Sequence, residues 1–247
     1  MRSAAAARLS IAAALALSGM AASAVAASFE DTMAQRVLAC TGCHGPQGRA
    51  APDGYYPRIA GKPAGYLFNQ LLNFRDGRRQ YALMNGLLAP LDDAFLAEIA
   101  THFAGLEVPY PPPVQAPEAG NGLAARLVRD GDPSRRLPAC NACHGAAMSG
   151  VAPFVPGLLG LPRDYVNAQL GAWRTGKRKA QAPDCMAIVA QKLAPDEIAT
   201  ISAWLASQPA GAAPAAGFAA PPPLDCGGVA PAGDATGARD AATKTGR

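Results

Sequence analysis

Two short motifs in this 247-residue chain place two thiols beside an imidazole. CTGCH runs from Cys40 to His44, and CNACH runs from Cys140 to His144, 100 residues further along the chain. In each motif the cysteines lie one helical turn apart, so both sulfurs can add across the vinyl groups of a haem. The adjoining histidine would then bind the iron as its proximal ligand. The motifs therefore predict two covalently attached haem c groups, each held by a cysteine pair: Cys40 with Cys43, and Cys140 with Cys143.

A zinc site and a thioredoxin-like dithiol are the competing interpretations of these cysteines. Zinc would require four closely grouped cysteine or histidine ligands. The chain has three histidines, and the third, His102, lies far in sequence from both motifs. Two copies of one pentapeptide inside a repeat favour haem over both alternatives.

The first residues predict export from the cytoplasm. Arg2 and Arg8 form a positive segment, residues 9–17 form a short apolar stretch, and the small residues 24–26 fit a cleavage site. The apolar stretch is shorter than the roughly 20 residues that span a bilayer. We therefore expect a signal peptide over residues 1–27 and a mature protein in the periplasm.

Charge argues against a nucleic-acid partner. The formal net charge is +4, and removal of Arg2 and Arg8 with the signal peptide lowers it to +2. Each haem adds two propionates, so the mature holoprotein would be close to neutral or mildly acidic. Nucleic-acid binding would need a clustered basic face.

The chain repeats itself at an offset of about 100 residues. Residues 65–79 align with residues 164–178, and both segments share a pattern of tyrosine, glutamine, leucine and an aromatic ring followed by arginines. Near the end of each copy, apolar residues spaced three and then four apart predict the buried stripe of an amphipathic helix. These residues are Leu96, Ile99 and Phe103 in the first copy, and Ile198, Ile201 and Leu205 in the second.

The repeat predicts an all-α protein of two tandem domains, with three helical parts in each. We expect the first domain over residues 28–107, a proline-rich extended linker over 108–120, and the second domain over 121–208. Residues 209–247 are rich in alanine, proline and glycine and have few large apolar side chains, so we expect a disordered tail there.

Two methionines are candidates for the sixth iron ligand. Met84 and Met186 correspond at an offset of 102, and each lies just before the last helix of its copy. Methionine can also be apolar filler, but two at equivalent positions favour axial ligation. His/Met ligation raises the reduction potential and suits electron transfer. His102 aligns with Trp204, so we interpret it as structural, and the alternative is that it binds an iron in place of a methionine.

Prolines and arginines supply candidates for the surroundings of each haem. The carbonyls of Pro57 and Pro156 would accept the free ring N–H of the ligating histidines, which fixes the imidazole. A simple chain turn is the alternative. Arg79 and Arg178, with their basic neighbours, would neutralise propionates or cross the domain interface, and a solvated basic face is the other interpretation.

Two cysteines remain after haem attachment. Cys185 adjoins Met186, and Cys226 lies in the tail. In an oxidising compartment they would form a disulfide that pins the tail to the second domain. Alternatively, a Cys185 thiolate would bind the second iron in place of Met186.

With these features together, the chain resembles the di-haem class I cytochromes c of the c-four type. The resemblance covers roughly residues 29–207 and rests on CTGCHGPQG, PRIAGKPAGYLFNQLLNFRDGRR and the segment from Met84 onward, each with its second copy. It implies two cytochrome folds related by a pseudo-twofold axis, with His44 and Met84 on one iron and His144 and Met186 on the other. The sequence departs from the pattern at GAAMSG after His144, at Cys185 and in the tail.

The resemblance also implies an electron carrier rather than an enzyme. Its donor would be a quinol-oxidising complex or a dehydrogenase and its acceptor a terminal oxidase, with membrane contact only through these partners. Two alternatives stay open. One is a cytochrome subunit permanently bound to a periplasmic dehydrogenase, with the tail as tether. The other is a thiosulfate-oxidising di-haem enzyme that uses Cys185.

Overall fold

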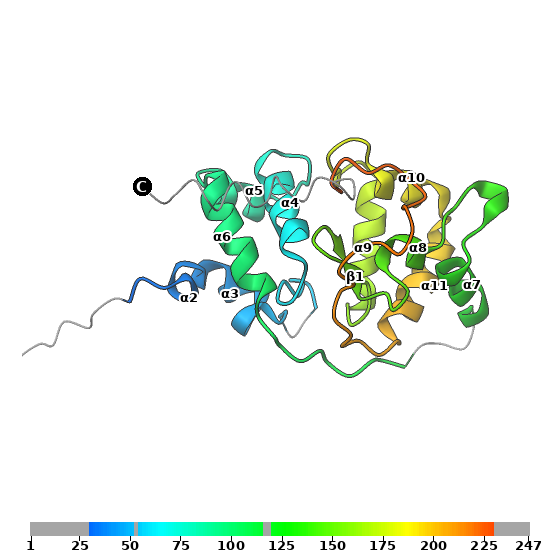
Figure 1. Ribbon diagram of the computed structural model, residues 1–247, viewed down its shortest axis with the longest axis horizontal. Coiled ribbons are helices and arrows are strands. Elements are labelled where there is room, and N and C mark those ends of the chain that lie inside the picture. The colour runs from blue at the N-terminus through cyan, green and yellow to red at the C-terminus, as the bar shows by residue number, and fades with distance from the viewer. Residues whose placement is uncertain (1–29, 52–53, 116–119, 230–247) are drawn as a thin grey trace, which may run out of the picture. The chain divides into compact units, whose positions relative to one another are not determined.

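The computed structural model describes residues 30–51, 54–115 and 120–229 (Figure 1). The expected signal peptide and the end of the tail, residues 230–247, lie outside the described residues. Every helix and strand of the described residues belongs to one compact unit that begins at Met33. Within this unit the first repeat is residues 33–107 and the second repeat is residues 121–208.

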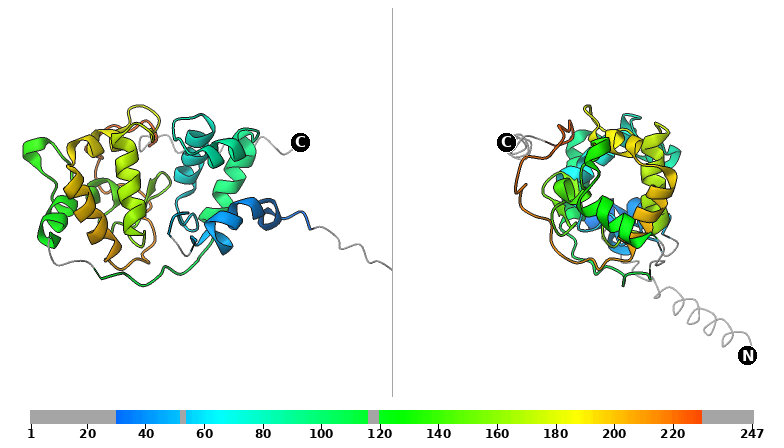
Figure 2. Two further views of the ribbon diagram at one scale, coloured as in Figure 1. Left: turned by 180° about the vertical axis from the view of Figure 1, so that it is seen from behind. Right: turned by 90° about the vertical axis from the view of Figure 1, so that its right-hand side faces the viewer.

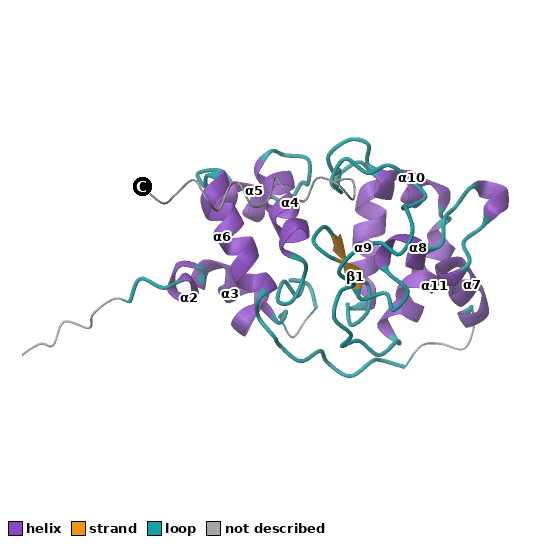
Figure 3. Ribbon diagram, viewed as in Figure 1, coloured by secondary structure: helices purple, strands orange, loops and turns teal. Residues whose placement is uncertain are grey.

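The described chain is mostly helical, as the sequence predicts (Figure 3). The first repeat contains α2 (Met33–Arg36), α3 (Leu38–His44), the 3-10 turn η2 (Pro46–Gly48), α4 (Ala64–Arg75), α5 (Ala82–Leu88) and α6 (Asp93–Ala104). The second contains α7 (Asn121–Arg129), the 3-10 turn η3 (Pro133–Arg135), α8 (Cys140–His144), α9 (Arg163–Arg174), α10 (Cys185–Lys192) and α11 (Pro195–Ala206).

The two repeats correspond helix by helix: α3 to α8, α4 to α9, α5 to α10 and α6 to α11. The second repeat adds a small antiparallel pair, β1 (Gly150–Val151) with β2 (Val155–Pro156), in which Val151 faces Val155. The sequence did not predict this pair. It lies in the loop after α8, where the two copies of the sequence differ most.

Side-chain and backbone contacts fix where the last helices begin. Asp92 accepts the backbone N–H of Phe95 at 2.8 Å and so caps α6. Asp184 caps α10 in the same way through Ala187. At α11, Pro195 occupies the first turn and Glu197 accepts the N–H of Ala194 at 2.9 Å. Each cap satisfies a donor that a helix start would leave unpaired.

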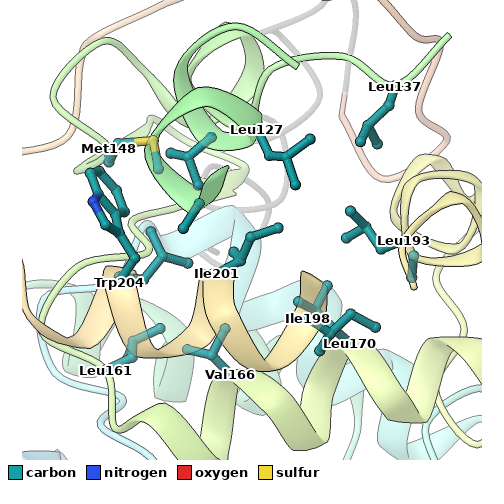
Figure 4. Close-up of a cluster of buried hydrophobic side chains, with 14 residues drawn as sticks. Leu127, Leu137, Met148, Leu161, Val166, Leu170, Leu193, Ile198, Ile201 and Trp204 are labelled. Carbon is teal, nitrogen blue, oxygen red and sulfur yellow. The ribbon is translucent and has the colours of Figure 1, made fainter. Parts of the chain in front are cut away.

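Each repeat has its own apolar core. In the first, α4 packs against α6, and the predicted stripe Leu96, Ile99 and Phe103 is buried. In the second, α11 packs against α9 and α7, and Ile198, Ile201 and Leu205 are buried. Figure 4 shows the side chains from these three helices pointing toward one another. The predicted stripes of the last helices are therefore confirmed.

The described part of the linker, residues 108–115, has no helix or strand. It is held to the first repeat by Arg58, whose guanidinium donates to the carbonyls of Val108 and Pro109 and stacks 3.9 Å over the ring of Tyr110. Val114 donates its N–H to the carbonyl of Ala206 in α11 at 3.3 Å. The linker is thus anchored at both ends by contacts that its proline content alone does not predict.

The start of the tail is bound to the second repeat (Figure 2). A disulfide joins Cys226 to Cys185, Ala215 pairs with Val151 in a parallel bridge, and Ser149 donates to the carbonyl of Ala213 at 2.8 Å. The prediction that the disordered tail begins at residue 209 therefore differs from the structure for residues 209–229. The covalent link and the backbone hydrogen bonds hold a segment whose own apolar content is too low to fold.

We expect Leu205→Ala to destabilise the second repeat by about 2–5 kcal/mol, because deleting buried methyl groups leaves a cavity. Leu205 is 2% exposed, whereas Leu123 on α7 is 38% exposed and provides a matched control as Leu123→Ala. Urea unfolding of the holoprotein, followed by circular dichroism, measures both changes. Equal losses in the two variants would contradict the packing of α11 described above.

Candidate haem-binding site

One continuous cavity of about 1300 Å³ connects the functional residues of both repeats. Most of its lining is apolar and comes from α4, α5 and α6 and from α9, α10 and α11. The candidate haem residues in this lining are Cys40, Cys43, His44 and Met84 of the first repeat and Cys140, His144 and Met186 of the second. Cys143 lies on α8 beside them and is not in the lining.

Each motif histidine ends a short helix and is held by one backbone carbonyl. His44 Nδ1 lies 2.7 Å from the carbonyl oxygen of Pro57, and His144 Nδ1 lies 2.8 Å from that of Pro156. Both side chains are 8% exposed. With Nδ1–H donating to the carbonyl, the lone pair of Nε2 is free for an iron.

A tight turn after His44 makes this contact possible. Gly45 has φ 75°, and a Cβ there would collide with the Ala50 carbonyl oxygen. Only glycine tolerates both the left-handed backbone and the close approach. The loop after it can therefore fold back until Pro57 reaches the imidazole. Gly145, with φ 80°, does the same after His144.

Burial keeps the candidate ligands uncharged. It lowers the pKa of the His44 and His144 imidazoles, which favours the neutral ring that iron ligation requires. Burial likewise raises the pKa of Cys40, and it raises that of Cys140 to about 11. Neutral side chains of this kind suit an apolar, water-poor cofactor site.

Met84 and Met186 are both partly buried and pack against the core of their repeats. Met84 lies in the first turn of α5, where Asn85 accepts the N–H of Tyr81 at 2.8 Å and donates to the carbonyl of Arg79 at 3.0 Å. Met186 lies in the first turn of α10, which Asp184 caps. Each sulfur therefore sits on a helix start that side-chain hydrogen bonds hold in place.

His102 lies elsewhere. Its ring is on α6, with its centroid 5.2 Å from that of Phe103, and it is not in the cavity lining. This position agrees with the structural role expected for it.

Arg79 and Arg178 meet where the repeats join. Their backbones form an antiparallel bridge, flanked by hydrogen bonds from Gln80 N–H to the Lys177 carbonyl and from Lys179 N–H to the Arg78 carbonyl, both 2.8 Å. Of the two roles expected for these arginines, the structure places them at the interface and also in the cavity lining.

The two guanidiniums share two glutamine acceptors. Arg79 donates to Gln169 at 2.6 Å and to Gln70 at 3.2 Å, and Arg178 donates to Gln169 at 2.8 Å and to Gln70 at 3.0 Å. Arg79 also reaches the hydroxyl of Tyr165, and Arg178 that of Tyr66. The pattern is reciprocal, as two copies related by a local twofold would produce.

This network carries charge without a carboxylate. Burial and then repulsion by Arg79 lower the pKa of Arg178, which is 5% exposed. Burial alone would raise the pKa of Tyr165, yet the two arginines hold it below its ordinary value. The rings of Phe74 and Trp173 lie under Arg79 and Arg178, 4.4 Å and 3.8 Å away, and offer cation–π stabilisation.

The residues fit two haems. The cavity offers cysteine sulfur, an imidazole and a thioether in each repeat, within apolar walls. Trp173 Nε1, in this lining, is buried and makes no hydrogen bond to the described residues. A haem carboxylate would supply both the missing acceptor for this indole and the anion that the arginines lack.

Two buried cations in the same cavity, Arg58 and Lys62, were not predicted from the sequence, and each is 5% exposed. Lys62 Nζ lies 3.3 Å from the carbonyl oxygen of Gly157 in the second repeat. The repeat carried a signal for both: Lys62 aligns with Leu161, and Arg58 with Gly157.

The described part of the chain has neither a metal cluster of its own nor a membrane-spanning helix. No group of three or more histidine, cysteine, aspartate or glutamate side chains there is arranged to hold a metal ion. No helix there is long and apolar enough to cross a membrane.

Comparison with known proteins gives clear relatives, although no family model matches the chain. A thiosulfate dehydrogenase electron acceptor from Thiomonas intermedia is 36% identical over 170 residues, which cover 69% of this chain and 78% of the relative. A cytochrome c4 from Pseudomonas aeruginosa is 33% identical and covers 69% of this chain and 84% of the relative. The solved structure of reduced cytochrome c4 from Pseudomonas stutzeri has a TM-score of 0.62 and 29% identity, and the match covers 70% of this chain and 95% of that one.

We expect Met84→Ala and Met186→Ala each to remove one of two methionine–iron charge-transfer bands from the far-red spectrum of the oxidised holoprotein. The physical reason is that each sulfur is the thioether that its repeat contributes to the cavity lining, together with the motif histidine. Met148→Leu is the control, because Met148 is 6% exposed but packs in the second core and is not in the cavity lining. A band that survives in either alanine variant would exclude that methionine as a ligand.

Proposed function

Because the chain belongs to the cytochrome c4 family of di-haem c-type cytochromes, we propose that it is a periplasmic electron carrier that takes electrons from a thiosulfate dehydrogenase and passes them to a terminal oxidase. Two covalent haem c groups and electron transfer come with the family. The donor is suggested by the name of the Thiomonas relative. The acceptor is what the resemblance to the family implies, and export is suggested by the signal peptide that the sequence predicts.

Haem iron supplies one-electron redox chemistry at two points. The chain's own residues hold and insulate those points. His44 and His144 present neutral imidazoles, and Pro57 and Pro156 fix their orientation through 2.7 and 2.8 Å hydrogen bonds. The arginine–glutamine network lies where the repeats join, in the lining of the one cavity that would enclose both haems.

The observation that supports a carrier most strongly is the position of the two methionines. Met84 and Met186 line the same cavity as His44 and His144, so each repeat could offer an iron both an imidazole and a thioether. Two protein ligands on each iron would leave no open position for a substrate, and the iron would then only exchange electrons. We therefore propose that the protein has no substrate chemistry of its own.

The thiosulfate-oxidising alternative requires a free Cys185 thiolate. The sulfur of Cys185 is bonded to Cys226. The alternative of a permanent subunit tethered by the tail is also weakened, because residues 209–229 bind the chain's own second repeat.

Stopped-flow absorbance with the oxidised holoprotein tests the donor and the enzyme question together. We expect thiosulfate alone to leave the haems oxidised, and thiosulfate with a catalytic amount of a thiosulfate dehydrogenase to reduce both. Reduction by thiosulfate alone would show an enzyme. No reduction in either mixture, with rapid reduction by dithionite, would exclude thiosulfate dehydrogenase as the donor.

We expect the double variant Cys185→Ser/Cys226→Ser to lose about 2–4 kcal/mol of stability in the second repeat, because the disulfide restricts the unfolded chain. It should keep both methionine–iron bands, since Asp184 still caps α10 and Ala190 still anchors the helix in the core. Denaturant unfolding and the far-red spectrum measure the two effects. A changed second band in this variant would mean that the disulfide, rather than the cap, positions Met186.

A further inference from the structure

Lys62 is a buried cation that the proposed function leaves unexplained. It precedes α4 and is 5% exposed. Among the described residues no carboxylate forms an ion pair with it, and its ammonium donates to the Gly157 carbonyl at 3.3 Å. An ammonium buried without a carboxylate is costly, so its presence calls for a compensating role.

The repeat shows that the fold does not require a cation there. Leu161 occupies the equivalent position of the second repeat and is 8% exposed within its core. A leucine side chain therefore satisfies the same place in the same fold. The charge at Lys62 is an addition to one repeat, and it makes the two haem environments unequal.

The ammonium is directed across the junction toward the second haem site. Its acceptor, Gly157, follows Pro156, whose carbonyl oxygen is 2.8 Å from His144 Nδ1. Lys62 therefore lies beside the loop that holds the second motif histidine, although it belongs to the first repeat.

We propose that the ammonium of Lys62 raises the reduction potential of the second haem more than that of the first, and so favours electron flow toward the second haem. A fixed positive charge in a low-dielectric interior favours the state that has gained an electron. Electrons that enter at the first haem would then move to the second. The inference rests on the two haem sites and on the carrier role proposed above.

The other charged group beside Lys62 does not cancel its effect. Arg58 is itself a cation, held by the carbonyls of Ala60, Val108 and Pro109. Burial and then repulsion from Arg58 lower the pKa of Lys62 to about 8. The group therefore remains largely protonated at neutral pH, so its charge is present under working conditions.

Spectroelectrochemical titration of the holoprotein tests the proposal. In Lys62→Leu, which copies Leu161, we expect the equilibrium constant for reduction of the second haem to fall about tenfold, a shift of about 59 mV for one electron. The first haem should shift less. Met84→His, which lowers the potential of the first haem by changing its ligand, identifies the two steps.

Three further variants separate charge from structure. Lys62→Arg keeps the charge and should leave the second potential near that of the wild type. Lys179→Leu removes an exposed lysine of the second repeat, whose charge is screened by water. This variant should shift the reduction potential of the second haem far less than Lys62→Leu does. Lys62→Gln gives the same comparison where the leucine variant does not retain both haems.

An unchanged second potential in Lys62→Leu, a shift confined to the first haem, or an equal shift in Lys62→Arg would each overturn the proposal. The far-red spectrum and haem content of the same samples keep this result separate from the proposed function. Two haems with two methionine bands and no dependence on Lys62 would leave the carrier role standing and remove only the present inference.

Discussion

The hydrogen bond from each motif imidazole to one proline carbonyl is the constraint on which the rest of the structure depends. It joins α3 to Pro57 at 2.7 Å and α8 to Pro156 at 2.8 Å, and so ties each attachment helix to the loop that leads into α4 or α9. That loop sets where the long helix begins, and the long helix carries the tyrosine and glutamine that meet the arginines of the junction. The geometry at the histidine is thereby transmitted to the contact between the repeats.

At the junction between the repeats, the two arginines are paired with neutral oxygens instead of with carboxylates. Arg79 and Arg178 lie side by side and share glutamine and tyrosine oxygens rather than carboxylates. Neutral acceptors leave the site with a net positive charge, which would be unfavourable in an apolar interior. Stacking on Phe74 and Trp173 offsets part of that cost, and the carboxylates of two haems, which the unpaired Trp173 indole also fits, would offset the remainder. The interface therefore suits two haem carboxylates, and we expect its stability to depend on haem retention.

The sequence alone predicted the helical repeats and the candidate haem ligands, because each pattern occurs in both copies of the repeat. The helix stripe predicted from Leu96, Ile99 and Phe103 is supported by the equivalent stripe of Ile198, Ile201 and Leu205, and both are buried. The paired methionines Met84 and Met186 likewise line the same cavity as His44 and His144. The repeat does not predict the features that are present in one copy only. The ordered start of the tail depends on a disulfide and on a bridge to Val151, and the β1–β2 pair depends on a loop unique to the second copy. The burial of Lys62 is a property of the fold, and the only sign of it in the sequence is the alignment of Lys62 with Leu161.

The positions at which the two repeats differ also make the two haem sites different. A symmetric pair of sites would have equal potentials and no preferred direction of electron flow. Position 62 has a cation where the second repeat has Leu161, Phe74 corresponds to Trp173 at the junction, and the exposed Leu83 of α5 corresponds to Cys185, which the tail covers through Cys226. Each difference changes charge, hydrogen bonding or solvent access on one side only, and these are the protein's means of tuning a haem. The duplicated fold supplies two sites, and the unduplicated residues decide the order in which they are used.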